Sequence, residues 1–337
     1  MTAADQSVRS SGAAPRLGVV VIGRNEGERL RRCLQSVLAQ AHTVVYVDSG
    51  STDDSVAMAT GLGALTHALD MQQPFTAARA RNEGARRLAA SAPGLEFIQF
   101  IDGDCELMPG WLDTAARFLD EHLTAAAVCG RRRERHPEHS VYNLLCDMEW
   151  DTPIGQTLAC GGDVLVRTEA LRQVVGFRDD LIAGEEPELC VRLRAKGWSI
   201  WRLDAEMTLH DAAMTTLRQW WMRSARAGFA FAQGVQMHGA RPERHWVREW
   251  RSAWFWGLLL PGLVLALGAF MSPLALLGLA LYPLQVLRLF LRTPGSVRAR
   301  LARSVFLVLG KFPEVAGQLK FLGHQLSGTR GRLIEYK

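Results

Sequence analysis

Residues 95–104 read LEFIQFIDGD, a short apolar run that ends in Asp102-Gly103-Asp104. An apolar run of this length predicts a buried strand. The glycine lets the backbone turn tightly and come close to a ligand. The segment therefore predicts two carboxylates on a tight turn at the carboxyl end of a buried strand.

The segments around this run predict the fold. Apolar residues at 17–23 (LGVVVIG) predict another buried strand, and further strands are predicted at 43–47, 125–129, 163–166 and 198–203. Predicted helices follow Asn25, begin near Asp53 and cover about 75–90, whereas residues 131–159 predict an irregular excursion. Strands that alternate with helices predict an α/β fold with a mostly parallel sheet flanked by helices.

In such a sheet the ligand lies beyond the carboxyl ends of the strands, where Asp48 and Asp102 are both expected. Hard cations such as Mg²⁺ or Mn²⁺ prefer oxygen ligands and leave positions open for phosphate oxygens. The carboxylates of Asp102 and Asp104 suit such an ion, although the same tripeptide also occurs in solvated turns. Asp48 could contact a nucleobase or ribose, or it could cap the turn that follows it.

Other polar residues are candidates for chemistry. Glu185 and Glu186 begin a predicted helix, where their negative charges could cap the helix or interact favourably with its dipole. Alternatively, one of them could act as a general base that takes a proton from an acceptor hydroxyl. His210 follows the last predicted strand and could ligate the metal or contact phosphate, or it could be structural. The run Arg131-Arg132-Arg133 is interpreted as solvated, with contact to phosphate or lipid as the alternative.

The bulk composition narrows the class of protein. The net charge of +5 is too small to indicate nucleic acid as a partner, and the six cysteines show no Cys-x-x-Cys pair, which favours reduced thiols in the cytoplasm. Residues 1–16 lack an apolar core and are interpreted as a disordered lead-in rather than a signal peptide.

The 35 residues from 253 to 287 contain no charged side chain. One helical span needs about 20 residues, so this length predicts two arms of about 17 to 18 residues with Pro273 in the turn between them. Arginines flank the stretch on both sides, which favours a hairpin with both ends in the cytoplasm. Two helices in the membrane interface, or buried against protein, are the alternative.

The chain is therefore expected to have five parts at the cytoplasmic face of the inner membrane. They are a lead-in (1–16), the α/β domain (17–215), basic and aromatic linker helices (216–252), a transmembrane or membrane-embedded hairpin (253–290), and an interfacial amphipathic helix with a tail (291–337).

Five motifs together resemble the family 2 glycosyltransferases, which are inverting enzymes with the GT-A-type, Rossmann-like fold. The resemblance covers about residues 17–215. The motifs are VVIGRNE at 20–26, VDSGSTDDS at 47–55, ARNEG at 80–84, DGD at 102–104 and GEEPELCVRL at 184–193.

The resemblance implies a role for each motif. Asp48 would contact the base, Asp104 would be the main metal ligand with Asp102 nearer the ribose and diphosphate, and Glu186 would be the base. Glu186 stands where the family has Asp, so Glu185 remains an alternative, and Ser49 replaces the second Asp of the family's pair. The other implied donor-binding residues are Ile22, Arg24, Asn25, Glu26, Ser51, Arg81, Asn82, Gly103 and Gly162, with Asp102 and His210 as further metal ligands.

The resemblance implies metal-dependent transfer of a sugar from a nucleotide sugar, with UDP as the expected nucleotide. The predicted hairpin and the arginines beside it would hold the rim of the sheet near lipid. The expected acceptor is therefore a hydroxyl of a lipid-linked saccharide in the assembly of a polysaccharide, such as an exopolysaccharide, or of a glycolipid. A polyprenyl-phosphate sugar synthase and an inactive membrane-anchored nucleotide-sugar-binding module are the alternatives. Gln219 and Arg223 have the wrong spacing for a processive synthase, and no Gly-rich loop after residue 23 supports nucleotidyl transfer.

Overall fold

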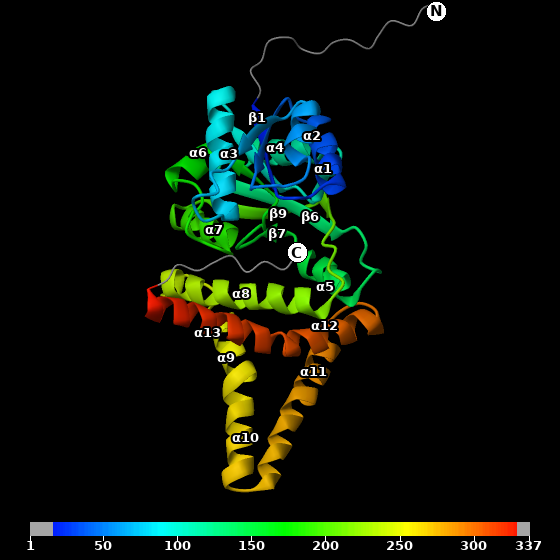
Figure 1. Ribbon diagram of the computed structural model, residues 1–337, viewed down its shortest axis with the longest axis vertical. Helices are drawn as coiled ribbons and strands as arrows, with labels where there is room; N and C mark the ends of the chain where they lie inside the picture. Colours follow the sequence, from blue (N-terminus) through cyan, green and yellow to red (C-terminus); the bar gives the residue numbers. More distant parts are fainter. Residues whose placement is uncertain (1–15, 329–337) are drawn as a thin grey trace, which may run out of the picture.

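The computed structural model describes residues 16–328. An α/β domain lies on a platform of long helices, and a two-helix hairpin projects from the far side of the platform (Figure 1). The predicted lead-in, apart from Arg16, and the end of the predicted tail lie outside the described residues.

Three of the first four strands in the chain, β1, β2 and β4, end within the sequence motifs around Gly23, Asp48 and Asp102. The four strands are β1 (Leu17–Gly23), β2 (Thr43–Asp48), β3 (Leu65–Ala68) and β4 (Phe97–Asp102), and they pair with one another in parallel. Asp48 lies opposite Gly23 and Asp102 opposite Ile22, so the two acidic residues end neighbouring parts of one rim.

The complete sheet is mixed rather than mostly parallel, which corrects the prediction. β8 pairs antiparallel with both β4 and β6, because it follows an excursion through α5 instead of a helical crossover from a neighbouring strand. β6 and β9 are parallel, and β5 and β7 each pair antiparallel with β9. The remaining strands are β5 (Cys105–Leu107), β6 (Ala125–Glu134), β7 (Gly155–Gln156), β8 (Val164–Arg167) and β9 (Ser199–His210), and the order is β3-β2-β1-β4-β8-β6-β9-β5.

Helices cover both faces of this sheet. Val19 and Val21 of β1 pack in one core, and Val20 and Ile22 pack in the other, which explains the continuous apolar run in its sequence. The helices are α1 (Glu28–Leu38), α2 (Ser55–Gly61), α3 (Ala77–Ser91), α4 (Trp111–Glu121), α5 (Val141–Trp150), α6 (Thr168–Gln173) and α7 (Glu185–Ala195).

The predicted irregular excursion at 131–159 is partly wrong. β6 continues to Glu134, and α5 occupies Val141–Trp150. The pattern missed α5 because its buried positions are Asn143 and Cys146 rather than an apolar stripe.

The platform contains the two long helices α8 (Leu217–His238) and α13 (Lys311–Ser327), which pack against each other. It also contains α12 (Val297–Leu309). Glycines allow the close approach, since a Cβ at Gly228 would lie 1.9 Å from the carbonyl oxygen of Glu314 and a Cβ at Gly317 would lie 1.9 Å from that of Ala225.

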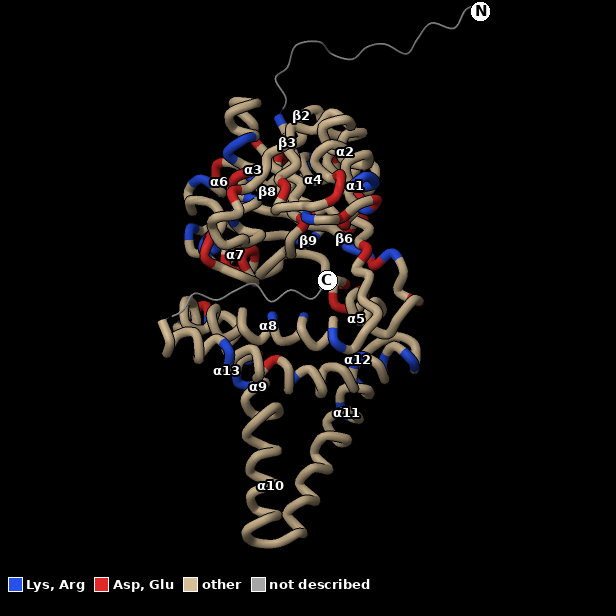
Figure 2. The backbone as a smooth tube through the Cα atoms, viewed as in Figure 1, with Lys and Arg blue, Asp and Glu red and all other residues tan. Residues whose placement is uncertain are grey.

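The hairpin has two arms that meet at Met271 and Ser272. The first consists of α9 (Val247–Trp254), η1 (Phe255–Leu259) and α10 (Leu260–Phe270), and the second of η2 (Pro273–Ala280) and α11 (Leu281–Arg292). Both arms are long and apolar enough to cross a membrane by length and composition, and the second arm has no buried residue. Figure 2 shows an uncharged tip and α10, with charged residues only towards the platform.

Gly84 of α3 faces the sheet too closely for a side chain. A Cβ there would lie 2.3 Å from Cγ1 of Val20, so Gly84→Ala is expected to destabilise the protein by about 1 to 3 kcal/mol through overpacking. The measurement is the melting temperature of the purified chain. Gly61→Ala is the matched control, since no atom lies within 4 Å of its Cβ. Equal melting temperatures for both variants would contradict this packing.

Candidate functional site

A cavity of about 580 Å³ opens at the carboxyl rim of β1 and β4, between the sheet and α8. Ten of the fifteen site residues predicted from the sequence line it: Ile22, Arg24, Asn25, Glu26, Arg81, Asp102, Gly103, Asp104, Glu185 and His210. The five that do not line it are Asp48, Ser51, Asn82, Gly162 and Glu186.

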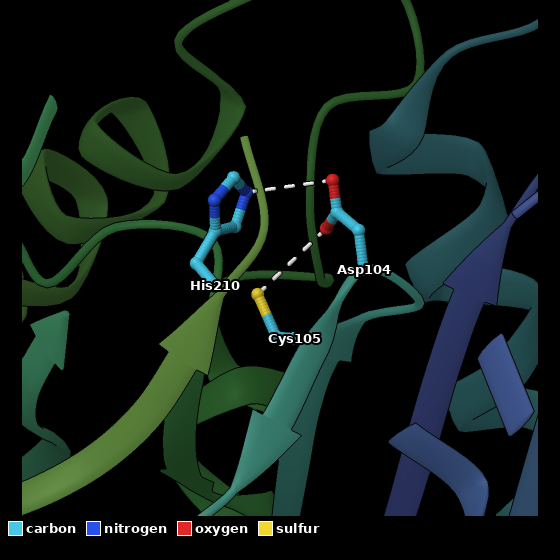
Figure 3. A group of neighbouring side chains, drawn as sticks. All are labelled: Asp104, Cys105 and His210. Atoms are coloured by element: carbon cyan, nitrogen blue, oxygen red, sulfur yellow. Dashed lines mark hydrogen bonds and ion pairs between the residues drawn. The ribbon is translucent and has the colours of Figure 1, made fainter. Parts of the chain in front are cut away.

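Asp104 and His210 are neighbours in the wall of the cavity, and their side chains point toward each other (Figure 3). The β5–β9 pairing sets Cys105 opposite His210, which brings Asp104 Oδ2 to 3.4 Å from His210 Nε2. Burial raises the pKa of Cys105 well above its usual value, so the thiol stays protonated and lies 3.7 Å from Asp104 Oδ1. Burial alone would lower the pKa of His210, but the neighbouring carboxylates, Asp104 above all, raise it.

Arg81 joins two carboxylates of the cavity. Its buried guanidinium donates to Glu185 Oε1 at 2.6 Å and to Asp102 Oδ1 at 2.7 Å. Burial acts to raise the pKa of Glu185, but Arg81 and Arg226 together hold it below its usual value. Gly162 lies behind this cluster, where a Cβ would come within 2.7 Å of Arg81 Nη2, so the missing side chain leaves room for the ion pairs.

Glu186 points away from the cavity. Its carboxylate accepts hydrogen bonds at 2.8 Å from the backbone N–H groups of Cys160 and Gly161, and the thiol of Cys190 also donates to it. Burial raises its pKa. Neighbouring helical residues point about 100° apart, so only one of the two glutamates can face the cavity from α7, and that one is Glu185.

Asp48 and Ser51 build the loop at the end of β2. Asp48 accepts from the hydroxyl of Tyr46 at 2.8 Å and from the backbone N–H groups of Gly50 and Ser51, so both of its oxygens are engaged within the turn. Ser51 Oγ accepts from the backbone N–H of Asn25, which ties the first two strand ends together.

Asn82 is among the predicted donor-binding residues but does not line the cavity, whereas Ser49, which is not among them, does. Asn82 donates to the carbonyl of Phe177 and to Asp179, so it fixes a loop outside the cavity. Ser49, which stands where the resembled family has Asp, lines the cavity instead, and its buried hydroxyl has no hydrogen-bond partner among residues 16–328.

The sequence did not identify the pair Arg132–Asp163. Asp163 Oδ2 lies 2.6 Å from Arg132 Nη2, and Oδ1 accepts from the backbone N–H of Asp102 at 3.0 Å, so Asp163 orients the turn at 102–104. The guanidinium of Arg132 lies 5.3 Å from the ring centre of Trp150, and both line the cavity. The interpretation of 131–133 as a solvated run is therefore wrong for Arg131 and Arg132, because β6 continues through them into the interior.

The platform helix α8 also contributes to the wall. Arg223 and Arg226 line the cavity, and Arg223 is held by Glu149 of α5 at 2.8 and 2.9 Å. No motif at 17–215 pointed to them, although their spacing of three residues puts both on one helical face.

Residues 18–158 match the model of the family described as "Glycosyl transferase family 2". The pre-mycofactocin glycosyltransferase of Mycobacterium tuberculosis is 27% identical over 235 residues, which are 65% of this chain and 47% of that protein. The glycosyltransferase AglE of Haloferax volcanii is 24% identical over 201 residues, which are 55% of this chain and 64% of that protein. The chain therefore spans about half the length of the first of these relatives.

A solved structure has the same fold. It is a mannosyltransferase from Pyrobaculum calidifontis in complex with GDP-mannose and Mn²⁺, with a TM-score of 0.63 and 20% sequence identity. The match covers 91% of this chain and 88% of that one, so it includes helices beyond the α/β domain. At this identity the likeness establishes the GT-A fold, which confirms the fold predicted from the motifs.

Proposed function

The chain belongs to the family 2 glycosyltransferases, and from that premise we propose that it transfers a sugar from a nucleotide sugar to a hydroxyl of a lipid-linked saccharide, with a divalent metal ion. The observation that carries the proposal is the cavity at the strand ends. Its wall combines the facing pair Asp104–His210 with the guanidinium groups of Arg81 and Arg132. Carboxylate and imidazole suit a metal ion, and guanidinium groups suit phosphate oxygens.

The residues present fit Mg²⁺ or Mn²⁺. Asp104 and His210 offer an oxygen and a nitrogen that face one another, whereas the protonated thiol of Cys105 offers no thiolate that would favour a softer ion. Asp102 is engaged by Arg81 and is better placed towards the nucleotide than as a principal metal ligand. A divalent cation held there supplies charge neutralisation for a departing diphosphate. The Mn²⁺ and GDP-mannose in the similar mannosyltransferase support this assignment.

Glu185 is the base in this proposal, in place of the Glu186 implied by the family motif. Glu185 lines the cavity, and Arg81 keeps its carboxylate ionised and fixed in position. An acceptor hydroxyl then attacks the anomeric carbon in line with the bond to the diphosphate. That bond breaks as the new glycosidic bond forms with inversion, and the hydroxyl proton goes to Glu185.

The acceptor is proposed to reach the cavity from a membrane. Arg223 and Arg226 form part of the cavity wall from α8, and α8 packs on α13 at the base of the hairpin (Figure 1). The platform helices α8 and α13 therefore lie between the cavity and two exposed apolar arms (Figure 1). This arrangement supports a cytoplasmic catalytic domain at the inner membrane and a lipid-linked acceptor.

A polyprenyl-phosphate sugar synthase is the second candidate. The two arginines of α8 in the cavity wall favour it, because guanidinium groups would also bind the phosphate of such an acceptor. A phosphate acceptor needs no strong base, so the two functions differ in how much the reaction depends on Glu185.

A screen of nucleotide sugars tests the proposed function. Membranes that contain the full chain are incubated with UDP- and GDP-linked sugars and Mn²⁺, and the released nucleoside diphosphate is measured. We expect at least one donor to be turned over about tenfold or more above the rate with excess chelator, because the metal supplies several kcal/mol of charge stabilisation. Release from no donor would leave the inactive binding module as the better account.

A further inference from the structure

A second cavity lies at the base of the first hairpin arm. It has a volume of about 510 Å³ and is lined by Arg244, Val247, Arg248, Arg251, Ser252, Phe255 and Trp256. Positions 248, 251 and 255 recur every three or four residues, so they share one side of α9 and its continuation. Arg244 lies in the turn before α9 and lines the same cavity. We call the three arginines and their cavity the arginine recess.

The arginines of the recess have no acidic partner. Arg244, Arg248 and Arg251 are exposed, and none forms an ion pair or a side-chain hydrogen bond within residues 16–328. Glu243, which precedes Arg244 in the sequence, instead binds Arg194 of α7 at 2.7 Å.

The second acid of this region also faces elsewhere. Glu249 lies close enough to Glu314 of α13 to raise its pKa, together with the larger effect of burial. The recess therefore concentrates three positive charges, and no acidic residue is among those that line it.

The recess leads directly into the apolar arm. Phe255 is 47% exposed, and the next turn continues with exposed Leu258 and Leu259. The arms are joined at this level by Tyr282, whose hydroxyl donates to the carbonyl of Trp256 at 2.5 Å. Aromatic side chains beside arginines at the start of an apolar helix are typical of the level of lipid headgroups.

We propose that the arginine recess binds the phosphate of an anionic lipid headgroup, with Phe255 and Trp256 against the glycerol and upper acyl chain. Guanidinium groups match phosphate oxygens in charge and in the geometry of their hydrogen bonds. A lipid is the fitting source of phosphate because the recess continues into exposed apolar surface, which a soluble anion would leave in water. The inference rests on the proposed membrane placement of the hairpin, but not on the glycosyl transfer.

Native mass spectrometry of the full chain in detergent tests the site. The probes are phosphatidylglycerol and phosphatidylcholine with identical acyl chains. One variant carries Arg244→Gln, Arg248→Gln and Arg251→Gln. The matched control carries Arg86→Gln, Arg87→Gln and Arg178→Gln, which removes the same charge from side chains that are 62%, 54% and 44% exposed on the α/β domain.

The unmodified chain and the control are expected to retain phosphatidylglycerol in preference to phosphatidylcholine. The recess variant is expected to lose about a hundredfold in affinity for phosphatidylglycerol, since each arginine near an anionic surface contributes about a factor of five. Equal affinity in the recess variant and the control would overturn the site. Displacement of the lipid by millimolar inorganic phosphate would overturn the lipid as the ligand.

Flotation with phosphatidylcholine vesicles tests the premise separately. All three proteins are expected to float, because the apolar arms suffice for insertion. A chain that stays in the aqueous fraction would overturn the membrane placement and the lipid assignment with it. Flotation combined with unchanged phosphatidylglycerol affinity would overturn the recess alone.

Discussion

Glu185→Gln is expected to lower kcat by about a thousandfold, the middle of the range that general base catalysis contributes. Glutamine keeps the shape of the side chain and can still accept a hydrogen bond from Arg81, but it cannot take a proton from the acceptor hydroxyl. The affinity for the donor should change little, because Asp102 continues to bind Arg81. Initial rates at saturating donor, with donor binding measured in parallel, test this expectation.

Glu186→Gln is the matched control for that experiment. Its carboxylate accepts from two backbone N–H groups, and an amide offers only one oxygen for them. We expect a lower melting temperature for this variant, with kcat per folded molecule within about tenfold of the unmodified chain. If Glu186→Gln removes turnover from the folded protein and Glu185→Gln does not, the base is Glu186. Substantial turnover in both variants would favour the polyprenyl-phosphate sugar synthase.

Asp104→Asn is expected to remove metal-dependent donor binding and to reduce turnover by about a thousandfold or more. Asn keeps one neutral oxygen in place of a charged carboxylate, and hard divalent cations depend on that charge. Mn²⁺-dependent binding of the nucleoside diphosphate measures the effect. The control is Cys105→Ser, for which we expect nearly unchanged metal dependence because the buried thiol is protonated. A larger loss in Cys105→Ser than in Asp104→Asn would contradict the proposed ligands.

The fold could be predicted where burial leaves a strong pattern. The strand predicted at 17–23 has the same bounds as β1, because its residues pack in the cores on both faces of the sheet. The strand order could not be predicted. β8 lies antiparallel between β4 and β6, and no local property of 164–167 states which neighbours it has.

Part of the candidate site could likewise be predicted from the sequence, and part depends on tertiary contacts. The turn at 102–104 and the rim with Asp48 follow from strand ends, which the sequence marks clearly. The choice between Glu185 and Glu186 depends on the rotational position of α7 at its first turn, and that is set by the contacts of Glu186 with Cys160 and Gly161. Arg132 and Asp163 are 31 residues apart and meet only because β6 and β8 are neighbours.

The proposed function requires that the cavity bind a nucleoside diphosphate together with a divalent metal ion. The most direct measurement is a calorimetric titration of the purified full chain with UDP and with GDP, in the presence of Mn²⁺ and in the presence of excess chelator. We expect saturable binding of at least one nucleotide with Mn²⁺, weakened by about tenfold or more without it. No binding of either nucleotide with Mn²⁺, or equal binding with chelator, would contradict it.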